Sequence, residues 1–192
     1  MIVTDELVSM LSFCEAHKYR RVVQKQNVSV KKASKMHSRN IRILKEIEPG
    51  ELGSISLYDE ATQIGFTVGL IKNADDSLFS ATYVRTDKLY NTDMDIAKIA
   101  ISCLVREGFE IKEHYFMHQT DEYCVDSWEN IDTVRFAREA QAVAFWVHGL
   151  LNKKFRPYVP ESRCRACRLK NDCKNFLRYN QVEVDLINTE LV

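Results

Sequence analysis

The sequence predicts an α+β domain in which helices flank a central mixed sheet. Residues 52–86 alternate apolar and polar side chains with the period of two that is typical of strands. The residues on both sides of this stretch repeat their apolar positions with the helical period of 3.6. Hydrophobic residues make up 45% of the chain and charged residues 28%, which is the composition of an ordinary globular protein.

The length of 192 residues is that of a single domain. We divide it into N-terminal basic helices (1–48), an α/β core (52–152) and a C-terminal cysteine segment (153–192). No apolar run approaches the roughly 20 residues of a membrane helix, and the acidic N-terminus lacks the pattern of a secretory signal. We therefore expect an intracellular protein, whose six cysteines are thiols or metal ligands more often than disulfides.

Apolar spacing in the N-terminal part predicts one helix or two short ones over residues 5–25. A second, basic helix is expected over residues 30–48, because Pro49-Gly50 follows it. Its lysines and arginines would face outward. Its expected inward positions are Val30, Ala33, Met36, Ile41, Leu44 and Ile47.

The core begins with three expected strands, 54–58, 64–71 and 78–85, which turn-forming residues separate into an antiparallel meander. A helix over 93–107 should end at Gly108. A strand over 109–119, an extended piece around Cys124 and a long helix over 132–152 follow. The loop 155–160 then leads to the cysteine segment, and 172–179 is expected as a last short helix.

Charge is divided unevenly along a chain whose formal net charge is zero. Residues 1–45 carry ten Lys and Arg residues but three Asp and Glu residues. Residues 46–139 carry eight Lys and Arg residues and nineteen Asp and Glu residues. Residues 140–192 carry nine Lys and Arg residues and five Asp and Glu residues. Both ends are therefore basic, and they would suit a phosphate backbone if they met in space. Solvated helix faces are the alternative explanation.

Three cysteines near the C-terminus, Cys164, Cys167 and Cys173, form a C-x2-C-x5-C pattern that is typical of a metal or cluster site. Three thiolates leave one ligand position open. Another cysteine, a histidine or an external ligand could fill it. Cys103 on an apolar helix face and Cys124 in a strand-like segment are expected to be buried core residues.

The order of helices and strands, followed by C-x2-C-x5-C, resembles the RecB-like branch of the PD-(D/E)XK nucleases. The resemblance is to members with an iron–sulfur cluster, such as the CRISPR-associated RecB-like exonucleases. The segment Ser9-Met10-Leu11-Ser12-Phe13-Cys14-Glu15-Ala16-His17-Lys18-Tyr19-Arg20 is similar to the N-terminal signature of that family. The resemblance covers nearly the whole chain and implies the restriction-endonuclease-like core.

The resemblance also implies that Cys14 is the fourth ligand of a 4Fe–4S cluster with Cys164, Cys167 and Cys173. Four cysteines can also form a structural zinc site, which is the alternative to the cluster, and a chain without metal is a third possibility. A cluster would join residues 150 positions apart and so restrict the unfolded chain strongly.

A nuclease of this family carries an aspartate on one strand and Glu-x-Lys on the next, which hold a divalent metal at the scissile phosphate. Here Val68 stands at the aspartate position, and Tyr83 or Thr82 stands at the glutamate position. Arg85 with Thr86 best fits the lysine-threonine pair. His37 falls where the family often has a histidine ligand, although a core or exposed histidine is an equal alternative.

A displaced catalytic motif is the alternative to a missing one. Glu110-Ile111-Lys112 is a literal Glu-x-Lys with Asp93 and Asp95 upstream, but it follows the helix that the family motif precedes. The solvent face of an edge strand explains it without chemistry. Acids in the expected turns could supply ligands, but turn acids usually cap the turn or are solvated: Asp59, Glu60, Asp75 and Asp76.

We therefore expect an inactive nuclease-fold protein that binds nucleic acid nonspecifically, or a protein partner. An active exonuclease with displaced ligands and Mg or Mn is the second hypothesis, and a subunit that binds a helicase, nuclease or polymerase without binding DNA is the third. The expected phosphate contacts lie near the cysteine cluster: Lys18, Arg20, Arg21, Arg163, Arg165, Arg168 and Lys170.

Overall fold

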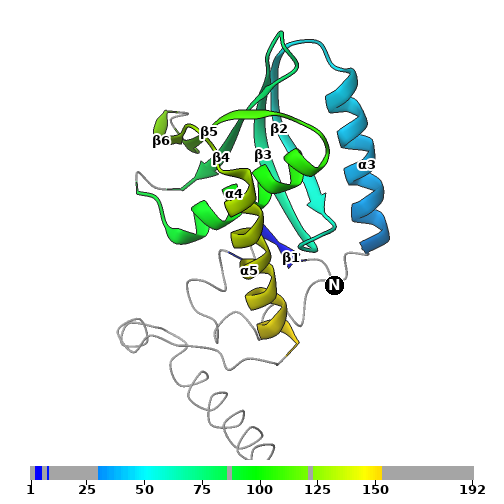
Figure 1. Ribbon diagram of the computed structural model, residues 1–192, viewed down its shortest axis with the longest axis vertical. Coiled ribbons are helices and arrows are strands. Elements are labelled where there is room, and N and C mark those ends of the chain that lie inside the picture. Colours follow the sequence, from blue (N-terminus) through cyan, green and yellow to red (C-terminus); the bar gives the residue numbers. More distant parts are fainter. Residues whose placement is uncertain (1–2, 6–7, 9–29, 86–87, 121–122, 153–192) are drawn as a thin grey trace, which may run out of the picture.

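The structure is a computed structural model that describes residues 3–5, 8, 30–85, 88–120 and 123–152. Within these ranges it shows a six-stranded mixed sheet with three helices (Figure 1). The predicted α+β class and mixed sheet are therefore confirmed. The expected helix over 172–179 lies outside the described residues, and so does the one over 5–25 except at Asp5 and Val8, which are helical. No described helix is long and apolar enough to cross a membrane.

The helices and strands of the core lie close to their predicted positions. The strands are β1 (Val3–Thr4), β2 (Gly50–Asp59), β3 (Ile64–Lys72), β4 (Leu78–Val84), β5 (Ile111–His118) and β6 (Cys124–Trp128). The helices are α3 (Val30–Glu46), α4 (Asn91–Arg106) and α5 (Thr133–Leu151). Gly108, with φ of 89°, follows the C-terminus of α4, as expected for a residue that ends a helix in the left-handed region.

The sheet combines an antiparallel meander with one parallel crossover. β2, β3 and β4 pair antiparallel in sequence order, and α4 then connects β4 to β5, which pair parallel. β6 returns antiparallel to β5. The short strand β1 pairs parallel with the beginning of β3, at Ile64 and Gly65, whereas β4 pairs with the end of β3 from Gly69.

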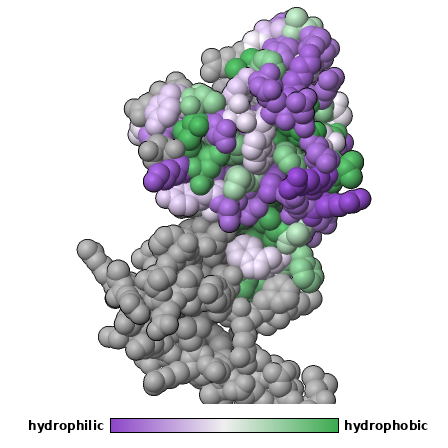
Figure 2. Space-filling view, turned by 60° about the vertical axis from the view of Figure 1, so that its left-hand side comes forward, coloured by the Kyte–Doolittle hydropathy of each residue, from purple (hydrophilic) through white to green (hydrophobic). Residues whose placement is uncertain are grey.

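Helices α4 and α5 form two layers over one face of the sheet. Buried residues occur around most of α4 because the sheet packs on one side of it and α5 on another (Figure 1). Apolar residues of all three layers form the main core, which includes Val68 of β3, Ile99 of α4 and Val147 of α5. Hydrophilic residues cover much of the face shown in Figure 2, with smaller hydrophobic patches between them.

Helix α3 lies along the edge of β2 that no described strand pairs with (Figure 1). The Asn40 amide donates to the Ser56 carbonyl at 2.7 Å, and the Tyr58 backbone N–H donates to His37 Nδ1 at 3.4 Å. Alternate residues of an edge strand direct their free N–H and C=O groups outward, and these contacts satisfy the Ser56 carbonyl and the Tyr58 N–H among them. Side chains one helical turn apart on α3 therefore cover an edge that could otherwise pair with another chain.

The buried stripe of α3 differs from the predicted one. Ala33, His37, Ile41 and Leu44 are buried, whereas Met36 is 42% exposed, and Val30 and Ile47 are exposed as well. The prediction was wrong at these positions because it selected apolar residues. The helical spacing of four, four and three residues places a histidine inside instead.

Two expectations about strands were also wrong. Cys103 is buried as predicted, but Cys124 is exposed because it begins β6, which pairs with β5 alone among the described strands. The strand that carries Lys112 was expected at an edge, yet β5 lies between β4 and β6. Lys112 is nevertheless exposed, because its side chain points away from the helical layers.

Candidate functional site

The positions at which a nuclease of the RecB-like type would carry metal ligands are closed to solvent or face away from each other. Val68 is 0% exposed and Thr82 is 4% exposed, and both face the helical layers. Tyr83 is 37% exposed on the opposite face, where its ring lies against Gly69. Successive side chains of a strand point to opposite faces, so the Val68 and Tyr83 positions cannot share one ion.

A histidine from β5 fills the space beside these positions. His114 Nδ1 lies 2.7 Å from Ser80 Oγ, and its Nε2 lies 3.0 Å from Thr82 Oγ1. All three residues are buried, and both of these hydrogen-bond partners of the imidazole are uncharged hydroxyls. The result is a neutral hydrogen-bonded group beneath α4, at the positions to which the resemblance assigns metal ligands.

Burial lowers the pKa of His114 to about 3, because the protonated imidazole would lose its hydration without gaining a counter-charge. The imidazole is therefore neutral in the folded protein at ordinary pH. Its aromatic neighbours are Phe116 at 5.0 Å and Trp128 at 5.8 Å between ring centroids. Both hydroxyl partners can act as donor or acceptor, so either neutral tautomer is satisfied.

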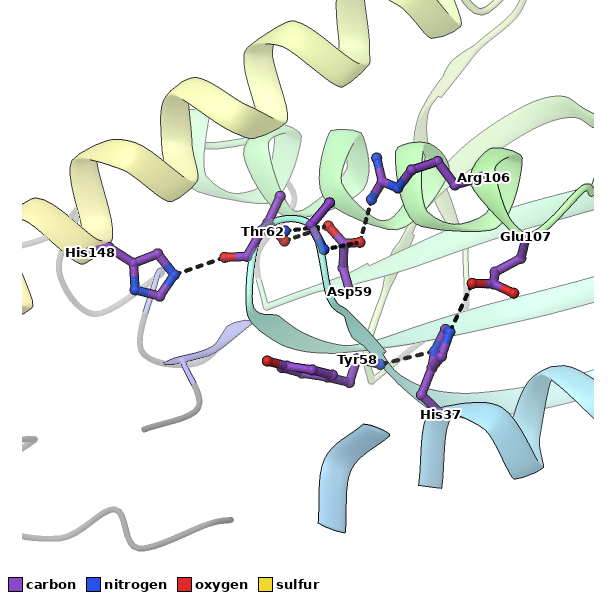
Figure 3. Close-up of polar contacts among 8 residues, drawn as sticks. His37, Tyr58, Asp59, Thr62, Arg106, Glu107 and His148 are labelled. Carbon is purple, nitrogen blue, oxygen red and sulfur yellow. Dashed lines mark hydrogen bonds and ion pairs between the residues drawn. The ribbon is translucent and has the colours of Figure 1, made fainter. Parts of the chain in front are cut away.

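A second polar group surrounds the turn between β2 and β3 (Figure 3). Asp59, which is 2% exposed, accepts hydrogen bonds from the backbone of Ala61 and from the backbone and hydroxyl of Thr62. The same carboxylate forms an ion pair with Arg106 at the end of α4. Asp59 therefore caps its own turn and attaches it to the central helix, as acids in turns commonly do.

The neighbouring helices reach the same turn through two histidines (Figure 3). His148 of α5 donates from Nε2 to the Thr62 carbonyl at 2.8 Å. His37 of α3 lies 3.1 Å from the Glu107 carboxylate through Nε2, while its Nδ1 accepts from Tyr58. With a proton on Nε2, both nitrogens of His37 are occupied, and no lone pair remains for a metal. His37 therefore connects α3 to β2 and α4.

The remaining candidates for chemistry lie apart from both polar groups. Lys112 forms an ion pair with Asp75 at the surface, and this bond holds the pKa of the Asp75 carboxyl below its usual range. Asp93 caps α4 by accepting from the Tyr90 backbone at 2.9 Å, and Asp95 lies 3.8 Å from Lys98. Glu110 and Arg85 are exposed. These side chains have structural partners or lie in solvent, and they do not converge.

No group of three or more His, Cys, Asp or Glu among the described residues could hold a metal ion. The predicted cluster ligands Cys14, Cys164, Cys167 and Cys173 lie outside the described residues. The predicted phosphate contacts lie outside them too: Lys18, Arg20, Arg21, Arg163, Arg165, Arg168 and Lys170. Both sets remain predictions from the sequence.

Sequence reasoning missed His114, Arg106 and His148. The signal for His114 was weak, because His114 alternates with Phe116 but the register of β5 shifts after Ile111, so the inward positions do not follow one period of two. Arg106 gave no signal, because its partner Asp59 lies 47 residues away. The position of His148 next to the buried Val147 of α5 indicated that it could face inward. Nothing in the sequence indicated the residue that it contacts.

Comparison with known proteins adds no assignment. No protein-family model matches the chain, and no curated protein matches it significantly. The resemblance to RecB-like nucleases therefore depends on the order of elements, the N-terminal segment 9–20 and the cysteine pattern.

The Asp59–Arg106 pair should contribute measurably to the stability of the fold. We expect Asp59→Ala to lower the free energy of unfolding by about 3 kcal/mol, because it removes the turn cap as well as a buried charge pair. Arg106→Ala should lower the free energy of unfolding by a smaller amount, since the guanidinium is partly exposed. The double variant should lose less stability than the sum of the losses of the two single variants, because the two residues interact. Denaturant unfolding measures all three. Exposed Arg138→Ala is the control, and strict additivity would contradict the contact.

His114 should make stability depend on pH. Its pKa is about 3 in the folded protein and about 6.5 when unfolded, so between these values the unfolded chain binds one more proton. The free energy of unfolding should therefore fall by about 1.4 kcal/mol per pH unit as pH drops below about 6.5. We expect His114→Gln to remove that part of the pH dependence between pH 7 and 5. An unchanged slope would show that His114 is not neutral and buried as described.

Proposed function

We propose that the chain is a nuclease-fold protein without a nuclease catalytic site, which binds nucleic acid, a protein partner or both. The described order of elements supports the first part. A helix, a three-stranded antiparallel meander, a crossover helix and a parallel strand follow one another, in the order on which the RecB-like resemblance was based.

The observation that carries the proposal is the closed group around Val68. A metal-dependent nuclease needs two or more carboxylates that open to solvent and to the phosphate. At the corresponding positions this chain has Val68 in the core and Thr82 bonded to a neutral His114. A carboxylate at either place would be buried without a counter-charge, which is costly. In our proposal the chain therefore keeps the helices and strands of the nuclease fold, but its interior around Val68 and Thr82 is apolar and uncharged.

The contacts of His37 also support a protein without a nuclease catalytic site. In an active member of the family, the helix that precedes the meander often supplies a histidine to the metal. Here α3 supplies a histidine at that place, and its two nitrogens are used by the Tyr58 backbone and the Glu107 carboxylate. This use of His37 in stabilising the fold favours a binding module over an exonuclease with displaced ligands.

Nucleic acid is the partner that the charge distribution favours, because both ends of the chain are basic. In our proposal a 4Fe–4S cluster on Cys14, Cys164, Cys167 and Cys173 joins these ends, and zinc on the same thiolates is the alternative. The cluster's part would be structural: it would hold the two basic segments together and contribute to folding.

Charge reversal near the proposed cluster tests the binding function. We expect Arg20→Glu, Arg21→Glu and Arg165→Glu together to weaken binding to DNA or RNA by at least about tenfold, and to reduce the steepness of its salt dependence. Fluorescence anisotropy at several salt concentrations measures both quantities. Unchanged affinity in this variant would contradict binding through the cluster region. Wild-type protein that binds no nucleic acid would instead favour a subunit that contacts only a helicase, nuclease or polymerase.

A further inference from the structure

The outward face of α3 is a continuous row of positive charge. Six of its seventeen residues are lysine or arginine, and the one acidic residue is its last, Glu46. All six are exposed. Their spacing of mostly three or four residues places them along one side of the helix. The row, called here the α3 basic face, consists of Lys31, Lys32, Lys35, Arg39, Arg42 and Lys45.

Contacts within the described residues account for one side chain of the α3 basic face alone: Lys45 Nζ lies 5.8 Å from the centroid of the Phe109 ring. None of its six side chains forms an ion pair there, in contrast to Lys98 and Arg135, which both pair with Glu139. Like charges four residues apart, as at Lys31, Lys35 and Arg39, destabilise a helix by about 0.2–0.5 kcal/mol per pair. A face that served only solubility would carry both signs and avoid this cost.

The opposite side of α3 is already occupied by the fold. Ala33, Ile41 and Leu44 are buried, and His37 and Asn40 bind the edge of β2. A helix that lies on a membrane inserts its own apolar side into the lipid. The buried apolar side chains of α3 are used within the protein, and those left at its surface, Val30, Met36 and Ile43, are only partly exposed, at 41%, 42% and 40%. An anionic membrane is therefore a poorer match. The α3 basic face is instead suited to a ligand that is held by charge alone.

The spacing of the charges matches a phosphate backbone. At about 1.5 Å per residue, Lys31 and Lys45 lie about 21 Å apart along the helix, which gives roughly one cation per 4 Å. Phosphates follow one another at about 3.4 Å along one nucleic-acid strand. Lysine and arginine can also contact guanine edges, but a row of cations at this spacing follows the backbone, and the Asn40 amide, a group that could read adenine, is bound to Ser56. We propose that the α3 basic face binds the phosphate backbone of nucleic acid without sequence preference.

This inference rests on the proposed nucleic-acid-binding function and assigns it a second surface, apart from the cysteine segment. Its test is fluorescence anisotropy of the full-length protein with a labelled 30-nucleotide single strand and the matching duplex. The variant is Lys35→Gln/Arg39→Gln/Arg42→Gln, which keeps good helix formers at exposed positions. We expect the dissociation constant to rise at least about tenfold and the logarithmic salt slope to fall by about three.

A matched pair of single variants controls for the loss of charge as such. Arg39→Gln should reduce the salt slope by about one, whereas Arg138→Gln, at an exposed position of α5, should leave it unchanged. Circular dichroism melting of each variant verifies that the fold is kept. Phosphatidylserine vesicles serve as a second probe, to which wild-type protein should bind weakly.

The outcomes separate this inference from the proposed function. If the triple variant binds nucleic acid as tightly as the wild-type protein does, the α3 basic face is not the binding site. The proposed nucleic-acid-binding function would stand in that case. Equal losses in Arg39→Gln and Arg138→Gln would overturn it as well, because net charge alone would then be responsible. Strong binding to vesicles, with none to either nucleic acid, would overturn the α3 basic face as a nucleic-acid site and the nucleic-acid part of the proposed function, and would leave the protein-partner part.

Discussion

The arrangement of the described residues depends on one buried carboxylate. Asp59 holds the turn between β2 and β3 in shape through Thr62, and its ion pair with Arg106 attaches that turn to α4. Because His148 binds the same turn from α5, and His37 binds the adjoining end of β2 from α3, all three helices are positioned from one place. A buried carboxylate without these partners would be costly, so the contacts are mutually dependent.

In the nuclease-type fold that we propose, this arrangement would allow the fold to persist without a catalytic site. The contacts around Asp59 use an aspartate, an arginine and histidines, yet none of them lies beside Val68 and Thr82, where a metal would be expected. At those positions His114 and two hydroxyls form a closed, neutral group. Stability and catalysis would therefore depend on different residues in this fold, and loss of the carboxylates would leave the frame intact. What remains for function is the surface, and charge is its most distinct property.

Local pattern predicted the helices and strands of the core well, because periodicity and turn residues act over a few positions. It predicted side-chain partners poorly. Met36 was expected inside from its apolar character, but the partner of α3 is a strand edge, which requires the hydrogen bonds of His37. Cys124 was expected to be buried, but burial depends on whether a neighbour covers β6. Arg106 and Asp59 meet only after the chain has folded, so no local signal could join them.

The central claim is that this protein holds nucleic acid without cutting it. The most direct test incubates end-labelled single- and double-stranded DNA with the protein and Mg²⁺ or Mn²⁺, under conditions in which anisotropy shows binding, and follows the length of the DNA. The account predicts bound DNA of unchanged length with either metal. Shortening that requires the metal, and that disappears in His37→Ala protein of unchanged DNA affinity, would contradict it and assign the chain to the active exonucleases.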